Sequence, residues 1–251
     1  MLLEKALQSV FQQKFHDFEI IVVDDCSTDE TFDFLSQYKA KDTITLIRNE
    51  HNLGLQKSLN KGLEYATGEF IARIDDDDLW IDEEKLKKQY DYLTKNPKVI
   101  LLGTAFKTDE GHIYNPQNDV DIRNQILFRC PFQHSTVMFK RIIDNQALRY
   151  NENLNYAEDW ELWLKLGKYG TFVNLSDVTT YIKTEDNLSK EYFVKQHKQN
   201  LRIIQAYASN YPRSTRANLY QRFVFVFFKL FPVNGRIHNF FKLLFRQVFK
   251  T

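Results

Sequence analysis

Residues 69–80 read EFIARIDDDDLW, an apolar stretch that ends in four consecutive aspartates, Asp75 to Asp78. A buried strand that delivers carboxylates at its C-terminal end places them where α/β sheets bind ligands. Adjacent carboxylates repel one another, which raises their pKa values unless a cation lies among them. Their hard oxygen atoms suit Mg²⁺ or Mn²⁺, which share their other positions with water and substrate phosphates. The alternative is a solvated acidic turn ahead of a helix, since runs of charge usually face water.

The composition fits one domain, or one domain with an appendage. The chain has 251 residues, of which 43% are hydrophobic, and this is enough for a sizeable core. Its two cysteines, Cys26 and Cys130, give no disulfide framework and favour a reducing compartment. We expect no secretory signal, and no stretch reaches the ~18 apolar residues of a membrane-spanning helix. These features predict a cytoplasmic protein.

The charge is distributed unevenly along the chain. The net charge is +1, yet residues 192–251 hold eleven Lys and Arg and no Asp or Glu. Residues 1–191 therefore carry 23 basic and 33 acidic residues, a net charge of −10. An acidic body with a basic, Phe-rich tail is predicted, divided into domains 1–190 and 191–251.

Strand-like and helical patterns alternate through the first two thirds of the chain, which is typical of βαβ units on a mainly parallel sheet. We expect Ser27 and Glu30 to form a capping box at the helix that follows the first strand, and Asp82 to cap a later helix. Beyond residue 187 the pattern is helical. The expected strands are 18–23, 43–48, 69–74, 98–104, 135–139 and 171–175. The expected tail helices are 187–209, 215–231 and 236–249.

Two further motifs carry candidate site residues near the N-terminus. The strand at 18–23 ends in Asp24 and Asp25, and a carboxylate there can accept hydrogen bonds from a nucleobase or from ribose hydroxyls. Asp25 is equally consistent with a turn residue. Gly54 lies in a loop before a helix, where backbone N–H groups can hold phosphate. An ordinary helix start explains Gly54 as well.

A second carboxylate site precedes the paired tryptophans. Glu158 and Asp159 stand at a helix start, where a carboxylate either stabilises the helix dipole or acts as a general base toward a sugar hydroxyl. His134 precedes an expected strand and could contact phosphate or acceptor. A lone histidine is more often structural.

Taken together, these pieces resemble the inverting family-2 glycosyltransferases of the GT-A fold. The matching stretches are FEIIVVDDCSTDET, NLGLQKSLNKGLEYATGEFIARIDDDDLW, HSTVMFKR and AEDWELWLKL. The resemblance implies a Rossmann-like, mainly parallel sheet flanked by helices, here with a C-terminal helical extension. It also implies a nucleotide-diphospho-sugar donor, Mn²⁺ or Mg²⁺, and inversion at the anomeric carbon.

The resemblance assigns roles to individual residues. Asp25 would meet the base, Asp75 to Asp77 would form the DxD motif with Asp77 as the main metal ligand, and Asp159 would be the catalytic base. The donor-binding set is Asp24, Asp25, Gly54, Asp75 and Asp76, the metal ligands are Asp77 and Asp75, and the candidate acceptor or phosphate contacts are His134, Glu158 and Lys183.

Two departures from the family pattern stand out. Family members begin with a strand ending in a Pro-x-Tyr-Asn-like turn, whereas this chain starts inside the helix expected to follow it. We therefore expect the first strand, and with it part of the donor site, to be missing. In the late loop where many relatives carry Arg or His, this chain has Lys183 as a substitute cation.

The tail has two interpretations. Its phenylalanines alternate with Lys and Arg, as in interfacial helices that lie on an anionic leaflet. The alternative is that the aromatic faces pack on the catalytic domain or on a partner. Nucleic acid fits less well, because the acidic body would repel it. The aromatic residues are Phe223, Phe225, Phe227, Phe228, Phe231, Phe240, Phe241, Phe245 and Phe249.

The sequence thus predicts a metal-dependent inverting glycosyltransferase at the inner face of the cell membrane. It would build a surface polysaccharide or glycolipid on a sugar or lipid-linked sugar acceptor. One rival is a nucleotidyltransferase, which would need a Gly-rich basic signature at the first strand. Another is a non-catalytic GT-A-like binding subunit, which a missing strand would make plausible.

Overall fold

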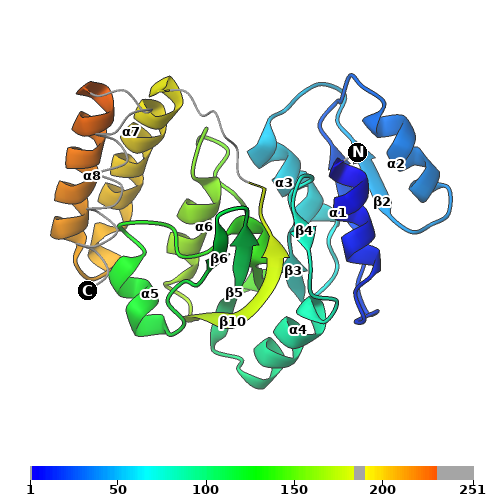
Figure 1. The fold of residues 1–251 in the computed structure, drawn as a ribbon, viewed down its shortest axis with the longest axis horizontal. Coiled ribbons are helices and arrows are strands. Elements are labelled where there is room, and N and C mark those ends of the chain that lie inside the picture. The colour runs from blue at the N-terminus through cyan, green and yellow to red at the C-terminus, as the bar shows by residue number, and fades with distance from the viewer. Residues whose placement is uncertain (1, 184–189, 231–251) are drawn as a thin grey trace. The chain divides into compact units, whose positions relative to one another are not determined.

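The computed structural model describes residues 2–183 and 190–230, which form two compact units (Figure 1). The larger unit contains residues 2–126 and 130–183, and the smaller contains 127–129 and 190–230. Among the helices of these residues, none has the length and apolar character needed to span a bilayer.

The larger unit alternates helices and strands, as the patterning predicts. Its helices are α1 (Leu2–Phe11), α2 (Thr31–Lys39), α3 (Leu55–Tyr65), α4 (Lys85–Lys95), α5 (Asp119–Gln125) and α6 (Glu158–Leu166), with a 3₁₀ turn at His134–Thr136. Its strands are β1 (Ile21–Asp24), β2 (Thr45–Arg48), β3 (Phe70–Ala72), β4 (Leu79–Trp80), β5 (Val99–Thr108), β6 (Gly111–Ile113), β7 (Met138–Lys140), β8 (Ile142–Ile143), β9 (Gln146–Ala147) and β10 (Thr171–Tyr181).

The main sheet is mixed, with the strand order β3-β7-β5-β10-β4 and β6 paired to β5. β5 and β10 are parallel, whereas β7 runs antiparallel to both β3 and β5. β1 and β2 form a separate parallel pair, and β8 and β9 form a small hairpin. The expected α/β class is confirmed, but the predicted mainly parallel sheet is not: among the described strands only β1–β2 and β5–β10 pair in parallel.

The core lies around β5. Residues 99–105 of this strand are all buried, because helices α4 and α6 both contact it. Leu101 pairs with Phe139 of β7, and Phe172 of β10 adjoins the same position. Trp163 of α6 stacks edge-on against Phe139 at 5.3 Å between ring centroids. A strand buried on both faces reads as a continuous apolar run, which is the pattern at 99–102.

The predicted capping box at α2 is wrong. Glu30 is the N-cap residue, and its side chain makes no capping hydrogen bond. The backbone N–H of Ser27 instead donates to the Asp24 carboxylate at 3.1 Å, because the chain turns directly after β1 with Cys26 at a φ of 63°. Ser27 therefore belongs to the turn after β1 and lies too early in the chain to cap α2.

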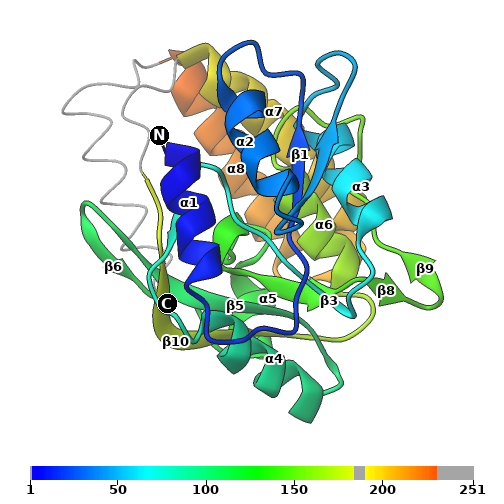
Figure 2. The same cartoon turned by 90° about the vertical axis from the view of Figure 1, so that its right-hand side faces the viewer.

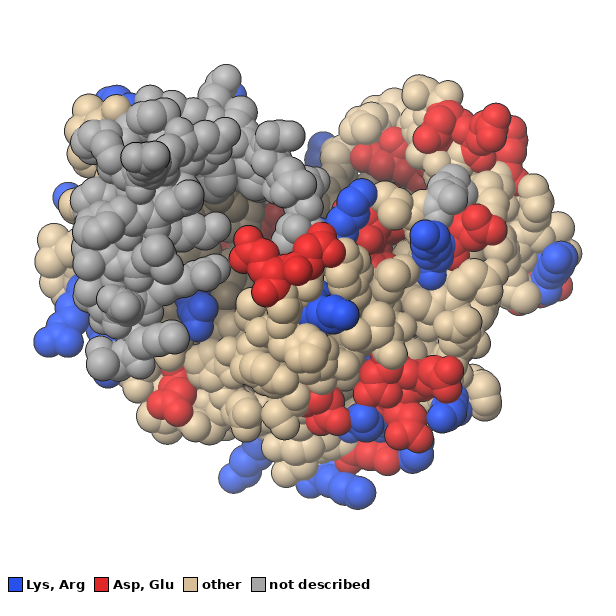
Figure 3. Space-filling view, viewed as in Figure 1, with Lys and Arg blue, Asp and Glu red and all other residues tan. Residues whose placement is uncertain are grey.

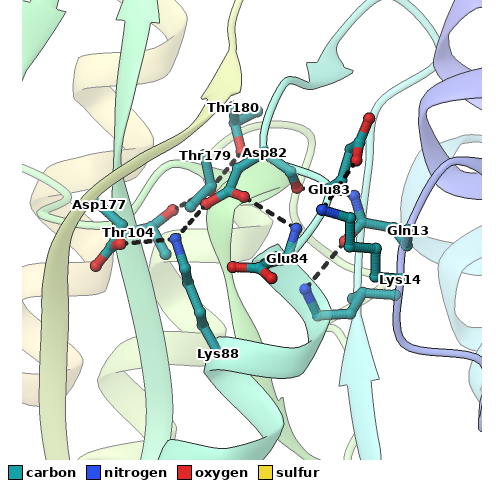
Figure 4. Close-up of polar contacts among 11 residues, drawn as sticks. Gln13, Lys14, Asp82, Glu83, Glu84, Lys88, Thr104, Asp177, Thr179 and Thr180 are labelled. Carbon is teal, nitrogen blue, oxygen red and sulfur yellow. Dashed lines mark hydrogen bonds and ion pairs between the residues drawn. The ribbon is translucent and has the colours of Figure 1, made fainter.

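A polar network fixes the start of α4 (Figure 4). Asp82 accepts the N–H of Glu84 at 2.9 Å and pairs with Lys88 at 2.7 Å, so it stabilises the turn just ahead of the helix. Lys88 also reaches Asp177 of β10 at 2.9 Å. The buried Gln13 side chain donates to the Asp82 carbonyl at 2.9 Å, and this ties the turn after α1 to α4. Acidic and basic side chains intermingle over α4 in Figure 3.

The smaller unit is a helical hairpin. α7 (Lys190–Tyr207) is followed by a 3₁₀ turn and by α8 (Ser214–Leu230). Gln221 of α8 donates to the Phe128 carbonyl at 2.9 Å and contacts the His197 ring of α7 at 3.1 Å. The helix expected at 236–249, with Phe240, Phe241, Phe245 and Phe249, lies outside the described residues, as do residues 184–189.

Candidate active site

The C-terminal ends of β1 and β3 open on one cavity of about 1000 Å³ in the larger unit. The side chains of Asp24, Asp25, Arg73, Asp75 and Asp76 line it. Two separate sequence motifs, one after each strand, are thereby brought to one cavity. The structure places candidate donor-binding residues from both strand ends together.

Asp24 is buried and held by neighbours of its own strand pair. Its carboxylate lies 3.2 Å from the Arg48 guanidinium at the end of β2, in addition to the bond from Ser27. Asp24 therefore shapes the turn after β1.

Asp25 organises the loop ahead of α3. One carboxylate oxygen accepts the Leu53 N–H at 2.7 Å and the Asn49 amide at 2.8 Å, and the other accepts the Gly54 N–H at 2.8 Å. Burial alone would raise the pKa of Asp25, but these donors outweigh it and lower the pKa. Gly54 has a φ of 87°, a region that side-chain-bearing residues rarely adopt. The Asp25 carboxylate therefore holds the Gly54 loop in its conformation.

Arg73 is a buried cation at the centre of the site. Its guanidinium pairs with Asp75 at 2.6 Å, and its other two nitrogens are buried without a hydrogen-bond partner. Burial would raise the pKa of Asp75, but the charge and hydrogen bond of Arg73 hold it at about 2. Asp75 is therefore fully ionised at neutral pH. The Nε and Nη1 groups of Arg73 are donors without a partner beside Asp75.

The remaining aspartates of the run differ in environment. Asp78 is buried, receives a 2.5 Å hydrogen bond from Ser135 and accepts the Lys183 N–H at 3.1 Å. Burial raises the pKa of Asp78 to about 6. Partial burial and the charge of Asp77 raise the pKa of Asp76. Asp77 forms no hydrogen bond or ion pair with the other described residues, so its oxygens are available to a ligand.

Asp159 lies at the first turn of α6, next to Glu158. The preceding residue, Ala157, adopts a left-handed backbone with φ 55° and ψ 34°, a strained conformation that often occurs at functional sites. Burial, and then the Glu158 charge, raise the pKa of Asp159, while Arg73 lowers it. Asp159 and Asp75 also interact through their charges, so the second carboxylate site belongs to the same electrostatic cluster.

His134 lies near Arg73 and Asp75 and interacts with the charges of both. It is buried, contacts the Tyr150 hydroxyl at 2.8 Å and stacks edge-on against Trp163. Burial, and then the Arg73 charge, lower its pKa well below the usual value, so the ring is neutral. The expected contact of His134 with phosphate or acceptor stays a prediction. Lys183 exposes its side chain and contributes its N–H to Asp78.

Sequence reasoning missed three residues of this cluster: Arg73, Ser135 and Tyr150. Ser135 accepts the Asp75 N–H at 2.9 Å and donates to Asp78, across about sixty positions of sequence. A lone basic residue inside an apolar strand was the available signal for Arg73. Ser135 and Tyr150 gave none, because their partners are remote in sequence.

A divalent cation fits part of this donor set. Over residues 2–183 and 190–230 no three His, Cys, Asp or Glu side chains converge as a complete metal cage. Asp77 and the ionised Asp75 offer hard oxygens, and magnesium-like ions take one or two carboxylates and complete their shell with phosphate and water. The residues suit a metal shared with a phosphate ligand.

The model of the family "Glycosyl transferase family 2" matches residues 2–151. The chain belongs to this family. It is 32% identical over 193 residues to the amylovoran biosynthesis glycosyltransferase AmsE of Erwinia amylovora, covering 74% of this chain and 72% of that protein. It is 29% identical to a Campylobacter jejuni GalNAc(5)-diNAcBac-PP-undecaprenol beta-1,3-glucosyltransferase, covering 68% of this chain and 57% of that protein.

Two solved structures resemble the fold. TarS of S. aureus in complex with UDP-GlcNAc has a TM-score of 0.65 and 24% identity, covering 89% of this chain and 69% of that one. The mannosyltransferase PcManGT of Pyrobaculum calidifontis in complex with GDP-Man and Mn²⁺ has a TM-score of 0.65 and 18% identity, covering 88% and 65%. The expected GT-A fold is confirmed, together with membership of glycosyltransferase family 2.

Proposed function

We propose that this glycosyltransferase moves a sugar from a nucleotide-diphospho-sugar to an acceptor hydroxyl, with inversion and with Mn²⁺ or Mg²⁺. One observation carries the proposal. Asp75 lines the cavity as an ionised carboxylate and interacts through its charge with Asp159, whose pKa is raised, while the unpaired Asp77 follows two residues further along the chain. A metal-bound leaving group and a separate proton acceptor require such a division between carboxylates.

The donor would lie between the ends of β1 and β3. Asp25 holds the Gly54 loop in place there, and Asp24, Asp75 and Asp76 line the same cavity. Asp77 and Asp75 would hold the cation, which stabilises the charge on the departing diphosphate as a Lewis acid. Arg73 offers two further N–H donors to anionic oxygen. The nucleotide-sugar complexes of both structural neighbours support this class of donor.

Asp159 would act as the base. It takes the proton of the acceptor hydroxyl as that oxygen attacks the anomeric carbon from the face opposite the nucleotide. The raised pKa of Asp159 suits this role, because a base works best with a pKa near the operating pH. The neighbouring Glu158 is held near Gln56, whose amide lies 3.5 Å from its carboxylate, and it would border the acceptor side together with Lys183.

The acceptor would be a growing surface polysaccharide or a lipid-linked sugar at the inner face of the cell membrane. The relatives' names support this, one through amylovoran and one through undecaprenol. α8 supports a membrane-surface location, because Leu219, Phe223, Val226 and Leu230 follow helical spacing and are 48–66% exposed. Basic residues and no acid occur along this helix, as an anionic leaflet would require.

The test separates donor binding from transfer. Asp159→Asn should bind a nucleotide diphosphate with Mn²⁺ as the unmodified chain does, yet transfer sugar ~100-fold more slowly or worse, because only the base is lost. Glu64→Gln, which removes an exposed pair to Arg149, is the control and should keep the rate. Wild-type transfer by Asp159→Asn, or a loss of donor affinity in it, would contradict the assignment. Binding without transfer in the unmodified chain would favour the non-catalytic alternative.

A further inference from the structure

Arg73 is the cation of the donor cavity. It directly follows β3, one of the two strands whose ends open on this cavity (Figure 2). Among the described residues that line the cavity it is the only Lys or Arg, whereas several of the lining residues are acidic. Burial would lower the pKa of Arg73, but the charge and hydrogen bond of Asp75 outweigh burial and raise it. A cation that enters the cavity therefore meets a fixed positive charge.

The hydrogen bonds of Arg73 are few for a buried guanidinium. Its Nη2 donates to Asp75 at 2.6 Å, whereas Nε and Nη1 are buried without a hydrogen-bond partner. Buried donors that lack a partner are costly, so a side chain that served only to crosslink the fold would pair them. What Arg73 contributes here is its charge.

That charge lies on a carboxylate that the proposed metal needs. Both oxygens of Asp75 are engaged, one by Arg73 at 2.6 Å and the other by the Ser135 hydroxyl at 3.1 Å. A divalent ion at Asp75 would share this carboxylate with a guanidinium, and the two positive charges would repel each other. Asp77 supplies one further carboxylate. Ions such as Mg²⁺ usually combine one or two carboxylates with substrate phosphates, since an all-protein cage is rarely built for them.

A diphosphate reverses this balance of charge. Its negative charge compensates that of Arg73, and its oxygens complete the coordination shell of the ion. Arg73 therefore opposes the metal alone far more strongly than it opposes the metal together with the diphosphate. In thermodynamic terms, such a cation couples the binding of metal and of nucleotide, and each raises the affinity for the other.

We infer that Arg73 is an internal counter-ion that keeps a divalent metal off Asp75 until the donor diphosphate is present. The inference rests on the proposed function, because it takes the metal to be shared with a nucleotide diphosphate. Arg73 is then a positioning residue, which acts on the metal through Asp75. Its charge also acts on Glu158 and Asp159, so one cation connects the metal side of the site with the acceptor side.

The test measures Mn²⁺ binding without nucleotide, from the electron paramagnetic resonance of the free ion. The unmodified chain is compared with Arg73→Met and Arg73→Gln, which remove the charge, and with Arg73→Lys, which keeps it. The two neutral variants should bind Mn²⁺ ~10-fold more tightly than the unmodified chain and Arg73→Lys, because a nearby like charge is lost. Adding Asp75→Asn to Arg73→Met should abolish this gain.

The sign of the change separates the two roles open to Arg73. A merely structural Arg73 predicts weaker Mn²⁺ binding in the neutral variants, because the acidic run would lose its shape. Unchanged or weaker Mn²⁺ affinity in both neutral variants would therefore overturn the inference. A gain that survives the addition of Asp75→Asn would also overturn it, because the metal would then be held elsewhere.

A second measurement uses the unmodified chain and does not depend on how the variants fold. The Nε–H NMR signal of Arg73 should be indifferent to Mg²⁺ alone and should shift when UDP is added with Mg²⁺. An equal shift with Mg²⁺ alone would overturn the inference. UDP that binds equally with and without Mg²⁺ would contradict the proposed function, and the nucleotide-free Mn²⁺ series would still decide the role of Arg73.

Discussion

At the scale of single residues, Arg73 determines the electrostatics of the site. Arg73 directly follows β3, forms an ion pair with the ionised Asp75 and lowers the pKa of Asp159. The acidic run and Asp159 could be found from sequence because they stand in recognisable motifs. Arg73 had one signal, a basic residue in an apolar strand, whereas the roles of Ser135 and Tyr150 depend on contacts that only the folded chain creates.

We predict that Arg73→Met moves the acid limb of the pH–rate profile upward. The base must be ionised, so the rate falls as pH drops through the pKa of Asp159. Arg73 lowers that pKa, and its removal should raise the half-maximal pH by about one unit, as is usual for loss of an adjacent opposite charge. Arg149→Met, which removes surface pairs to Glu64 and Glu152, is the control. An unshifted limb in Arg73→Met would separate Arg73 from the base.

Lys85 gives a second prediction at this scale. It is fully buried, donates to Gln89 at 2.6 Å and lies 4.4 Å from the Trp80 ring. Burial lowers its pKa from 10.5 to about 7. Between these values the unfolded chain binds the extra proton, so the stability contribution of Lys85 rises with pH by up to about 1.4 kcal/mol per unit.

Urea unfolding at pH 7, 8 and 9 tests this. The free energy of unfolding should rise more steeply with pH in the unmodified chain than in Lys85→Met. Lys87→Met, which removes an exposed pair to Asp91, should leave the slope unchanged. Parallel slopes in the unmodified chain and Lys85→Met would show that Lys85 keeps its proton in the folded state.

At the scale of elements, sequence patterning located most helices and strands but not their ends. The expected strand at 18–23 is reduced to Ile21–Asp24, and 135–139 becomes a 3₁₀ turn followed by β7. Propensity identifies an apolar run, whereas the ends depend on which neighbours supply hydrogen bonds. Among the described strands β1 pairs on one edge only, and this accounts for the half-buried side chains of residues 21–23.

The apolar stripe of α8 carries a prediction at the element scale. Leu219→Ser combined with Phe223→Ser and Val226→Ser should weaken binding to vesicles of anionic phospholipid ~5-fold or more, because the stripe supplies the inserted area. Val120→Ser on α5 removes an equally exposed apolar side chain and is the control. Binding should also fall with added salt. Vesicle binding that is unchanged by the triple substitution would favour a packing role for the stripe.

At the scale of the whole molecule, one cavity joins the ends of strands from two sheets. β1 ends at Asp24 and leads into Asp25, and β3 leads into Asp75, so the distance between the two sheets sets the width of the donor site. The fold class and the position of the carboxylate edge were predictable from sequence, since βαβ order determines them. That β1 and β3 belong to two separate sheets could be seen only from the strand pairing in the structure.

The central claim is that the acidic run holds a metal shared with the donor diphosphate. Calorimetric titration of UDP and of GDP, with and without Mn²⁺, tests it most directly in the unmodified chain and in Asp77→Asn. We predict that binding requires the metal and falls at least ~10-fold in Asp77→Asn, with an unchanged far-UV circular dichroism spectrum, because a charged oxygen ligand is lost. Equal affinity in the two proteins, or binding indifferent to Mn²⁺, would contradict the claim.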